Sequence, residues 1–147
     1  MSFFGSLDTS ASGLTAQRLR LDIISQNMAN ASTTRTENGG PYKRKTVVFE
    51  AIQNDINKDF QSILNRKKQS GCNGVRVAQI VEDQSEGNLV YDPSHPDANA
   101  QGYVEMPNVN TIDEMVNMIS ASRSYEANVN SFNSMKAMFT KALEIGK

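Results

Sequence analysis

A chain of 147 residues is long enough for one ordinary domain, and its formal net charge of −1 argues against a dedicated nucleic-acid-binding protein. Hydrophobic residues make up 38% and charged residues 21%, which allows a core of modest size. No apolar run approaches the ~18 residues that cross a membrane, and the first residues do not have the pattern of a cleaved signal peptide. These features alone predict a cytoplasmic protein, and the single Cys72 excludes an internal disulfide.

The first predicted element is a helix over about residues 6–31. Four apolar residues recur at every seventh position: Leu7, Leu14, Leu21 and Met28. This spacing predicts a main apolar seam of the kind that pairs helices. A second, shorter stripe with Leu19 and Ile23 lies roughly opposite. Gly13 within the helix costs about 1 kcal/mol relative to alanine.

The middle of the chain, about residues 36–107, changes to the period of β-strands. Four stretches rich in β-branched residues and bounded by turns predict short strands: 46–49, 74–81, 88–91 and 103–106. Turn-forming residues occupy 38–41 and 92–97. Residues 53–70 are ambiguous, because helical spacing of Ile56, Phe60 and Ile63 is combined with a basic run typical of a loop. A flexible loop is predicted near 53–72.

Charge is divided unevenly along this middle part. Residues 36–70 hold seven Lys or Arg against four acidic residues, a balance of +3, whereas residues 71–108 hold one against six, a balance of −5. Two interpretations stay open. The segments form two solvated surfaces of one domain, or they are complementary patches on successive subunits.

A second long helix is predicted over about residues 111–145. Thr111 and Glu114 fit a capping box, in which Thr111 caps a backbone amide and Glu114 reaches back. Aromatic residues then recur at every seventh position: Tyr125, Phe132 and Phe139.

Two long helices at the ends of a short chain pair only if the middle doubles back. The predicted fold is therefore α+β, with N- and C-terminal helices paired as an antiparallel coiled coil and a small β-rich insert. Both helices contain many Asn and Ser residues, which are mediocre helix formers, so their order depends on packing. The residues alone leave open whether that packing comes from the chain's own β-domain or from neighbouring copies.

The run from Ser12 to Asn30, SGLTAQRLRLDIISQNMAN, resembles the N-terminal signature of the flagellar axial proteins, although Gln26 stands where the pattern often has Asn. Residues 33–45, 89–110 and 114–128 resemble one subgroup of that family, the proximal rod proteins. Together these stretches cover nearly the whole chain except about residues 52–72.

This resemblance implies a non-enzymatic structural subunit of the flagellar basal-body rod. Its terminal helices would polymerise into a hollow drive shaft that transmits torque and lines the export channel. Residues 1–35 and 109–147 would form the inner helical domain, and residues 36–108 the β-rich outer insert.

The resemblance also implies partners and a location. The implied partners are further copies of the chain, other flagellar rod proteins, the flagellar export apparatus and basal-body ring components. The implied location is the rod outside the inner membrane, in the periplasmic or cell-wall zone, reached by type III export without a cleaved signal peptide. This replaces the cytoplasmic expectation.

The residues predicted to pack within and between subunits lie in the two helices. The resemblance assigns this role to Leu14, Ala16, Asn27, Ala29, Asn30, Met115, Ile119, Arg123, Tyr125 and Glu126. The heptad spacing adds Leu7, Leu21, Met28, Phe132 and Phe139. Arg123 and Glu126 form either a pair along one helix or an ion pair between subunits.

Other chemistry is weakly indicated. Asp92, His95 and Asp97 offer metal-ligand atoms, but the prolines beside His95 favour a structural turn. No catalytic residue, cofactor or metal is predicted. The alternative functions are a non-polymerising helical adaptor or secreted interaction module and, with no catalytic constellation to support it, a small hydrolase.

Overall fold

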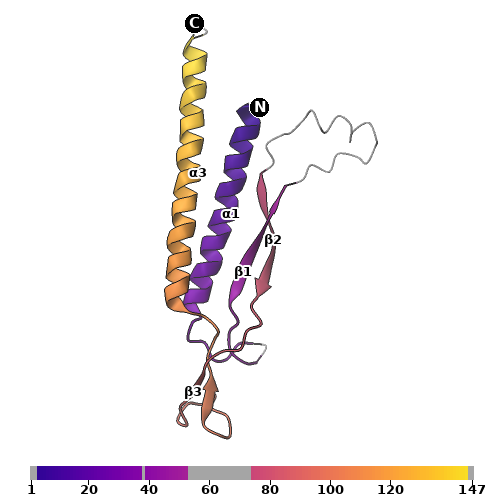
Figure 1. The fold of residues 1–147 in the computed structure, drawn as a ribbon, viewed down its shortest axis with the longest axis vertical. Coiled ribbons are helices and arrows are strands. Elements are labelled where there is room, and N and C mark those ends of the chain that lie inside the picture. The colour runs from indigo at the N-terminus through magenta and orange to yellow at the C-terminus, as the bar shows by residue number, and fades with distance from the viewer. Residues whose placement is uncertain (1–2, 38, 53–73, 146–147) are drawn as a thin grey trace, which may run out of the picture.

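The computed structural model describes residues 3–37, 39–52 and 74–145. Two long helices, α1 (Phe3–Ala29) and α3 (Thr111–Ile145), lie side by side and run in opposite directions, with a strand-rich insert between them in sequence (Figure 1). The predicted α+β class is confirmed. No helix within the described ranges is long and apolar enough to cross a membrane.

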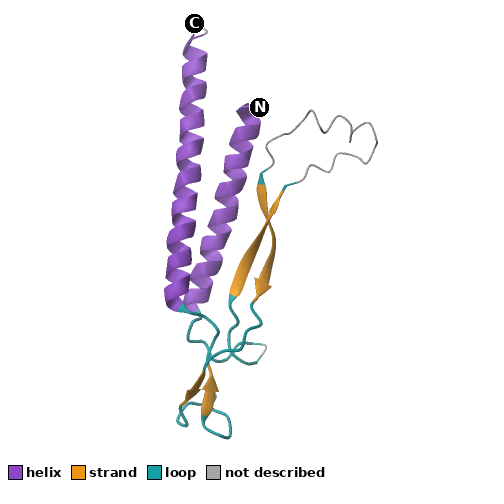
Figure 2. Ribbon diagram, in the orientation of Figure 1, coloured by secondary structure: helices purple, strands orange, loops and turns teal. Residues whose placement is uncertain are grey.

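The insert forms two separate antiparallel sheets of two strands each (Figure 2). Strand β1 (Lys45–Ala51) pairs with β2 (Val75–Glu82), and this hairpin packs along α1. Strand β3 (Leu89–Tyr91) pairs with β4 (Tyr103–Glu105) beyond the end of the helices that is remote from the chain termini. All four predicted strands are confirmed, whereas the ambiguous segment 53–70 lies outside the described residues.

The β1–β2 pairing brings the predicted basic and acidic segments together. Lys45 lies opposite Glu82 across the two strands, and the Asp83 amide donates a hydrogen bond to the Arg44 carbonyl at 2.7 Å. Arg76 on β2 also pairs with Glu50 on β1, at 3.1 Å. Opposite charges on neighbouring strands attract one another. Of these pairs, Lys45 and Glu82 join the basic excess to the acidic excess, whereas Arg76 and Glu50 each have the minority charge of their segment.

The face that α1 buries differs from the predicted seam. Its most buried positions are Gly13, Ala16, Ile23, Ile24 and Asn27. The predicted seam residues are only half-buried: Leu7, Leu14, Leu21 and Met28. Small side chains let two helices approach closely, and α1 contacts the β1–β2 hairpin as well as α3. The positions of large apolar residues in the sequence therefore did not predict which face of α1 is buried.

On α3 the buried and half-buried residues that alternate at spacings of four and three face α1: Glu114, Met118, Ala121, Tyr125, Asn128, Phe132 and Met135. This is the spacing of a heptad seam. The predicted helical bounds, 111–145, agree with the structure. Helix α1 begins three residues earlier than predicted and ends two residues earlier, since a turn between Asn30 and Thr33 follows it.

The predicted capping box of α3 is wrong. The side-chain oxygen of Asn110, not of Thr111, accepts the Ile112 amide at 3.0 Å. Glu114 does not reach back to the helix start but is turned into the protein, where it contacts Arg44 and Asn27. An asparagine is as good an N-cap as a threonine. The pattern Thr-x-x-Glu pointed to Thr111, although the N-cap is Asn110, the residue before it.

Gly13 has a packing role that accounts for its place inside a helix. A Cβ atom built on Gly13 would lie 3.1 Å from Nδ2 and 3.2 Å from Oδ1 of Asn128 on α3. These separations are too short for an ordinary contact, so the bare glycine lets the two helices approach. Gly39 and Gly40 have a different role: their positive φ angles of 76° and 84° form the predicted turn.

We predict that Gly13→Val destabilises the chain by about 1–3 kcal/mol, because the side chain forces Asn128 and the helices apart. Gly5 offers a matched control in the same helix, since nothing lies within 4 Å of a Cβ placed there. Gly5→Ala should be neutral or stabilising by up to about 1 kcal/mol. Urea unfolding followed by circular dichroism measures both, and equal effects of the two substitutions would contradict the role given to Gly13.

Candidate functional site

A buried cluster of polar side chains lies where the C-terminal end of α1, the start of β1 and the first turn of α3 meet. We call this cluster the polar joint and define it as Asn27, Tyr42, Arg44 and Glu114. Asn27 and Glu114 are 1% and 0% exposed, although both are polar. Burying such groups is unfavourable unless each is hydrogen-bonded, so the joint is stable only as a complete set.

The Asn27 amide makes every hydrogen bond that its side chain can form. Its Nδ2 donates to the Lys45 carbonyl at 2.8 Å and to Oε2 of Glu114 at 2.9 Å. Its Oδ1 accepts from the Tyr42 hydroxyl and from the Lys45 amide, both at 2.9 Å. An asparagine has two donors and two acceptor sites, and all four are used here. One side chain on α1 thereby fixes the first residue of β1 and the first turn of α3.

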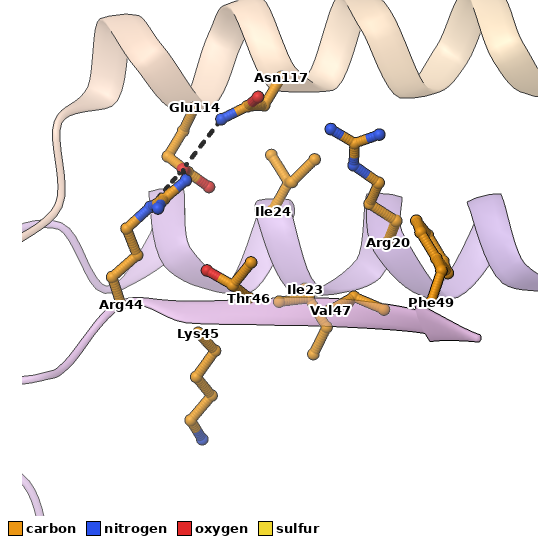
Figure 3. Close-up of a pocket in the computed structure, with 10 residues that line it drawn as sticks. All are labelled: Arg20, Ile23, Ile24, Arg44, Lys45, Thr46, Val47, Phe49, Glu114 and Asn117. Carbon is orange, nitrogen blue, oxygen red and sulfur yellow. Dashed lines mark hydrogen bonds and ion pairs between the residues drawn. The ribbon is translucent and has the colours of Figure 1, made fainter. Parts of the chain in front are cut away.

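Glu114 and Arg44 form the charged part of the joint (Figure 3). The Arg44 guanidinium contacts Oε1 of Glu114 with Nη2 at 2.7 Å and Nε at 2.8 Å. Asn117, one helical turn along, lies 3.5 Å from the same oxygen. Because Oε2 is bound by Asn27, both carboxylate oxygens have donors. The carboxylate also lies near the start of α3, where the helix dipole favours negative charge.

Asn108 connects the joint to the second strand. Its Oδ1 accepts the Arg44 amide at 2.7 Å, and its Nδ2 donates to the Asp83 carbonyl at 3.1 Å. The segment leading into α3 is thus bound to the residues that precede β1 and follow β2.

Burial of the Tyr42 hydroxyl raises the pKa of Tyr42, and the nearby Glu82 and Glu114 carboxylates raise it further. The Tyr42 hydroxyl is the donor in its bond to Oδ1 of Asn27.

A shallow pocket of about 280 Å³ lies beside the joint, between α1, β1 and α3 (Figure 3). Ile23, Ile24 and Val47 form part of its wall, next to the Arg44–Glu114 pair. Among the residues described there, Glu114 is the only carboxylate, and both its oxygens already accept hydrogen bonds. The geometry suits rigid attachment of three segments better than proton transfer.

A second feature is an apolar stripe on the exposed face of α3, the face turned away from α1. We define the apolar stripe as Ile112, Met115, Val116 and Ile119, whose exposed fractions are 50–68%. Four large apolar side chains that adjoin one another on a helix exceed the scattered exposure that is normal on a protein surface. Further along, α3 continues past the N-terminal end of α1 (Figure 1), and toward the C-terminal end of α3 the side chains of Met138, Leu143 and Ile145 are also exposed.

Sequence comparisons match both ends and the full length of the chain. Residues 7–35 match the family model for "Flagella basal body rod protein", and residues 100–145 match "Flagellar basal body rod FlgEFG protein C-terminal". The flagellar basal-body rod protein FlgC of Bacillus subtilis (strain 168) is 52% identical over the whole of both chains. FlgC of Borreliella burgdorferi is 49% identical, with 99% of this chain and 98% of the relative covered. FlgC of Escherichia coli O157:H7 is 41% identical over the whole of both.

The chain belongs to the FlgC family of flagellar basal-body rod proteins. Each family model contains one residue of the polar joint, because Asn27 lies within 7–35 and Glu114 within 100–145. Arg44 lies between them in the sequence and binds Glu114 from the strand side. The two segments that match the family models therefore meet at this cluster in the folded chain.

The structure places the predicted packing residues of this FlgC-family chain in three environments. Those turned toward the chain's own interior are Ala16, Asn27, Tyr125 and Phe132. Those half-buried on α1 or just after it are Leu7, Leu14, Leu21, Met28 and Asn30. Those exposed are Ala29, Met115, Ile119, Arg123, Glu126 and Phe139. Whether each also contacts another subunit stays a prediction.

The structure bears on two alternatives left open by the sequence: the pairing of Arg123 with Glu126, and the role of the segment from Asp92 to Asp97. The ion pairs within the described residues do not join Arg123 to Glu126, so the predicted pair along one helix is not formed in the isolated chain. Asp92 starts a turn, with its Oδ1 accepting the Ser94 amide at 3.1 Å, and hydrogen bonds from Ser94 lower the Asp92 pKa. His95 Nδ1 accepts the Asp97 amide at 3.1 Å, as a structural turn requires.

Reasoning from sequence missed Glu114 and Tyr42 as partners of Asn27, and Arg44 as the partner of Glu114. Glu114 was assigned to a cap and Arg44 to a solvated basic segment. A usable signal existed: a carboxylate at the first inward position of α3 must have a cationic partner if the helix packs on that face. The sequence did not indicate which of the basic residues 43–45 that partner is.

We predict that Glu114→Ala lowers the free energy of unfolding by about 3–5 kcal/mol, because Arg44 and Asn27 lose their buried acceptor. Glu50 is a matched control, since its carboxylate also pairs with an arginine but at an exposed position. Glu50→Ala should cost no more than about 1 kcal/mol. Urea unfolding measures both variants, and a Glu114→Ala effect as small as that of Glu50→Ala would refute the cost assigned to the joint.

Proposed function

We propose that the chain is a non-enzymatic structural subunit of the flagellar basal-body rod and assembles through its terminal helices. The observation that carries this proposal is the similarity over the full length to proteins named as flagellar basal-body rod protein FlgC. The apolar stripe on α3 supports it, since that face has large apolar side chains exposed to solvent in the single chain.

The apolar stripe provides a driving force for assembly. Fully burying one large aliphatic side chain is worth about 1.5–3 kcal/mol. Four half- or two-thirds-exposed side chains on one helix face therefore offer several kcal/mol when a neighbouring helix covers them. The exposed side chains of Met138, Leu143 and Ile145, toward the C-terminal end of α3, add to the surface available to neighbours.

In this proposal, residues 1–35 and 109–147 form an inner helical domain and residues 36–108 form an outer insert. The helices α1 and α3 pair as an antiparallel coiled coil, for which the heptad spacing on the inner face of α3 is the support. Many such pairs packed around an axis make a hollow shaft. Torque then passes through many helix contacts at once, and the lumen serves as the export channel.

The partners that fit this role are further copies of the chain and other rod proteins, with the export apparatus and ring components at the ends and outside of the shaft. The location is the basal-body rod outside the inner membrane, in the periplasmic or cell-wall zone, reached by export without a cleaved signal. The remaining packing residues, Ala29, Arg123 and Glu126 among them, are proposed to contact neighbouring subunits, since all three are exposed.

The second candidate is a helical adaptor that binds a partner through the same stripe but does not polymerise. The two functions differ in stoichiometry. An adaptor forms soluble complexes of fixed small size, whereas a rod subunit adds to a growing cylinder. Mass determination of complexes isolated from cells distinguishes the two, and discrete small complexes alone would exclude the rod.

We predict that Ile119→Glu abolishes motility in a flagellated bacterium that has this chain as its sole copy, because a charge in the apolar stripe cannot be buried against a neighbour. Ile119 is 56% exposed, so the folded monomer should change in stability by no more than about 0.5 kcal/mol. The control Ile119→Leu keeps the apolar character and should swim normally. Wild-type swimming by the Ile119→Glu strain would contradict both the stripe's role and the proposed assembly.

A further inference from the structure

The polar joint connects parts of the chain that loops alone would leave loosely attached. In the sequence, residues 30–44 separate α1 from β1, and residues 106–110 separate β4 from α3. The hairpin β1–β2 also contacts α1 where Val47 lies near Ile23, and near its far end the Val75 amide donates a hydrogen bond to the Ser12 hydroxyl at 3.1 Å. The joint holds the other end of the hairpin, the end that lies near the start of α3. We propose that the joint is a rigid coupling that fixes the orientation of the β1–β2 hairpin relative to the helix pair, so that both turn together. The torque-carrying part of this inference rests on the proposed function.

The first argument is that all four hydrogen-bonding positions of the Asn27 side chain are already occupied. Its four hydrogen bonds reach the side chains of Tyr42 and Glu114 and both backbone groups of Lys45. Any rotation of β1 against α1 breaks the two bonds to Lys45 together. The unmatched amide would stay inside the protein at 1% exposure, so small rotations are opposed strongly.

The second argument is that the bonds are directional. Apolar contacts between a helix and a sheet tolerate sliding, because the hydrophobic effect depends on area and not on angle. Hydrogen bonds weaken steeply as their angle departs from linear. The Arg44 guanidinium adds two contacts to one carboxylate oxygen of Glu114, which fixes β1 to α3 as well as to α1. A network with every member satisfied makes a packed region rigid.

The third argument is that both strands of the hairpin are tied, and not only β1. Asn108, on the segment entering α3, binds the Arg44 amide and the carbonyls of Asp83 and Ser85. Those residues precede β1 and follow β2. Pivoting of the hairpin about a single attachment point would therefore break bonds at more than one of these places.

A distance measurement on the complete chain tests the coupling directly. Spin labels are placed at Gln79→Cys on β2 and Ser120→Cys on α3, two exposed positions, with the single native cysteine removed as Cys72→Ser. Pulsed electron paramagnetic resonance should give one narrow distance distribution for the otherwise unchanged chain. Asn27→Ala should lose this single narrow peak, while circular dichroism retains the helical signal.

Two further variants make the result specific. Glu114→Gln keeps the shape of the side chain but removes its charge, and it should also broaden the distribution. Glu50→Gln, at the exposed pair with Arg76, should leave the distribution unchanged. If Asn27→Ala loses its helices, Tyr42→Phe takes its place, because this change removes one hydroxyl and no charge. A joint that only adds stability would lower the unfolding midpoint of these variants and leave the narrow peak intact.

The coupling is overturned if the unchanged chain already gives a broad distribution, or if the folded joint variants keep the narrow one. Failure of the proposed function gives a different result. A bacterium that lacks the chain and still builds a rod and swims would exclude the rod role without altering the label distances. Slower swimming of the Glu114→Gln strain in viscous medium, with rods assembled normally, would support the coupling within the rod.

Discussion

The ion pair between Glu114 and Arg44, completed by Asn27, is the constraint on which the arrangement of the other elements depends. A carboxylate that is 0% exposed is tolerated only with full compensation, and its three partners come from separate parts of the chain. Once these partners are in place, the end of α1, the start of β1 and the first turn of α3 have fixed positions. The helices then run away from this point, alongside each other, toward both chain termini (Figure 1).

Close approach of the two helices depends on small and polar residues instead of a continuous apolar seam. Gly13 leaves room for Asn128, while Ala16 and Ala121 are almost completely buried. Such contacts bury little apolar area, which limits how much the pair stabilises itself. Helices with many Asn and Ser residues draw their stability from packing, so a pair of this kind gains from any further surface that covers it.

The sequence was sufficient to predict the elements but not the contacts between them. Four strands were found from β-branched runs between turns, and the bounds of α3 from its period, because these patterns are local. The inner face of α1 was misassigned because Gly13, Ala16 and Asn27 have no strong apolar signal. Pairing Asn27 with Glu114 requires knowing that residues 87 apart in sequence meet, and a capping pattern gave Glu114 a local explanation. The family resemblance did mark Asn27, but not its partners.

In its first turns, helix α3 has more large apolar residues on the face turned away from α1 than on the face turned toward it. An ordinary surface helix turns its apolar side to the core and its polar side to water. In the first turns of α3, the inward positions hold Glu114, Met118 and Ala121, of which Met118 alone is large and apolar, whereas the outward positions hold Ile112, Val116 and Ile119. The inner face serves to fix orientation by directional bonds, and the outer face has the greater capacity for hydrophobic association. This division of tasks is what a subunit needs if it must hold its own shape before neighbours cover its remaining apolar surface.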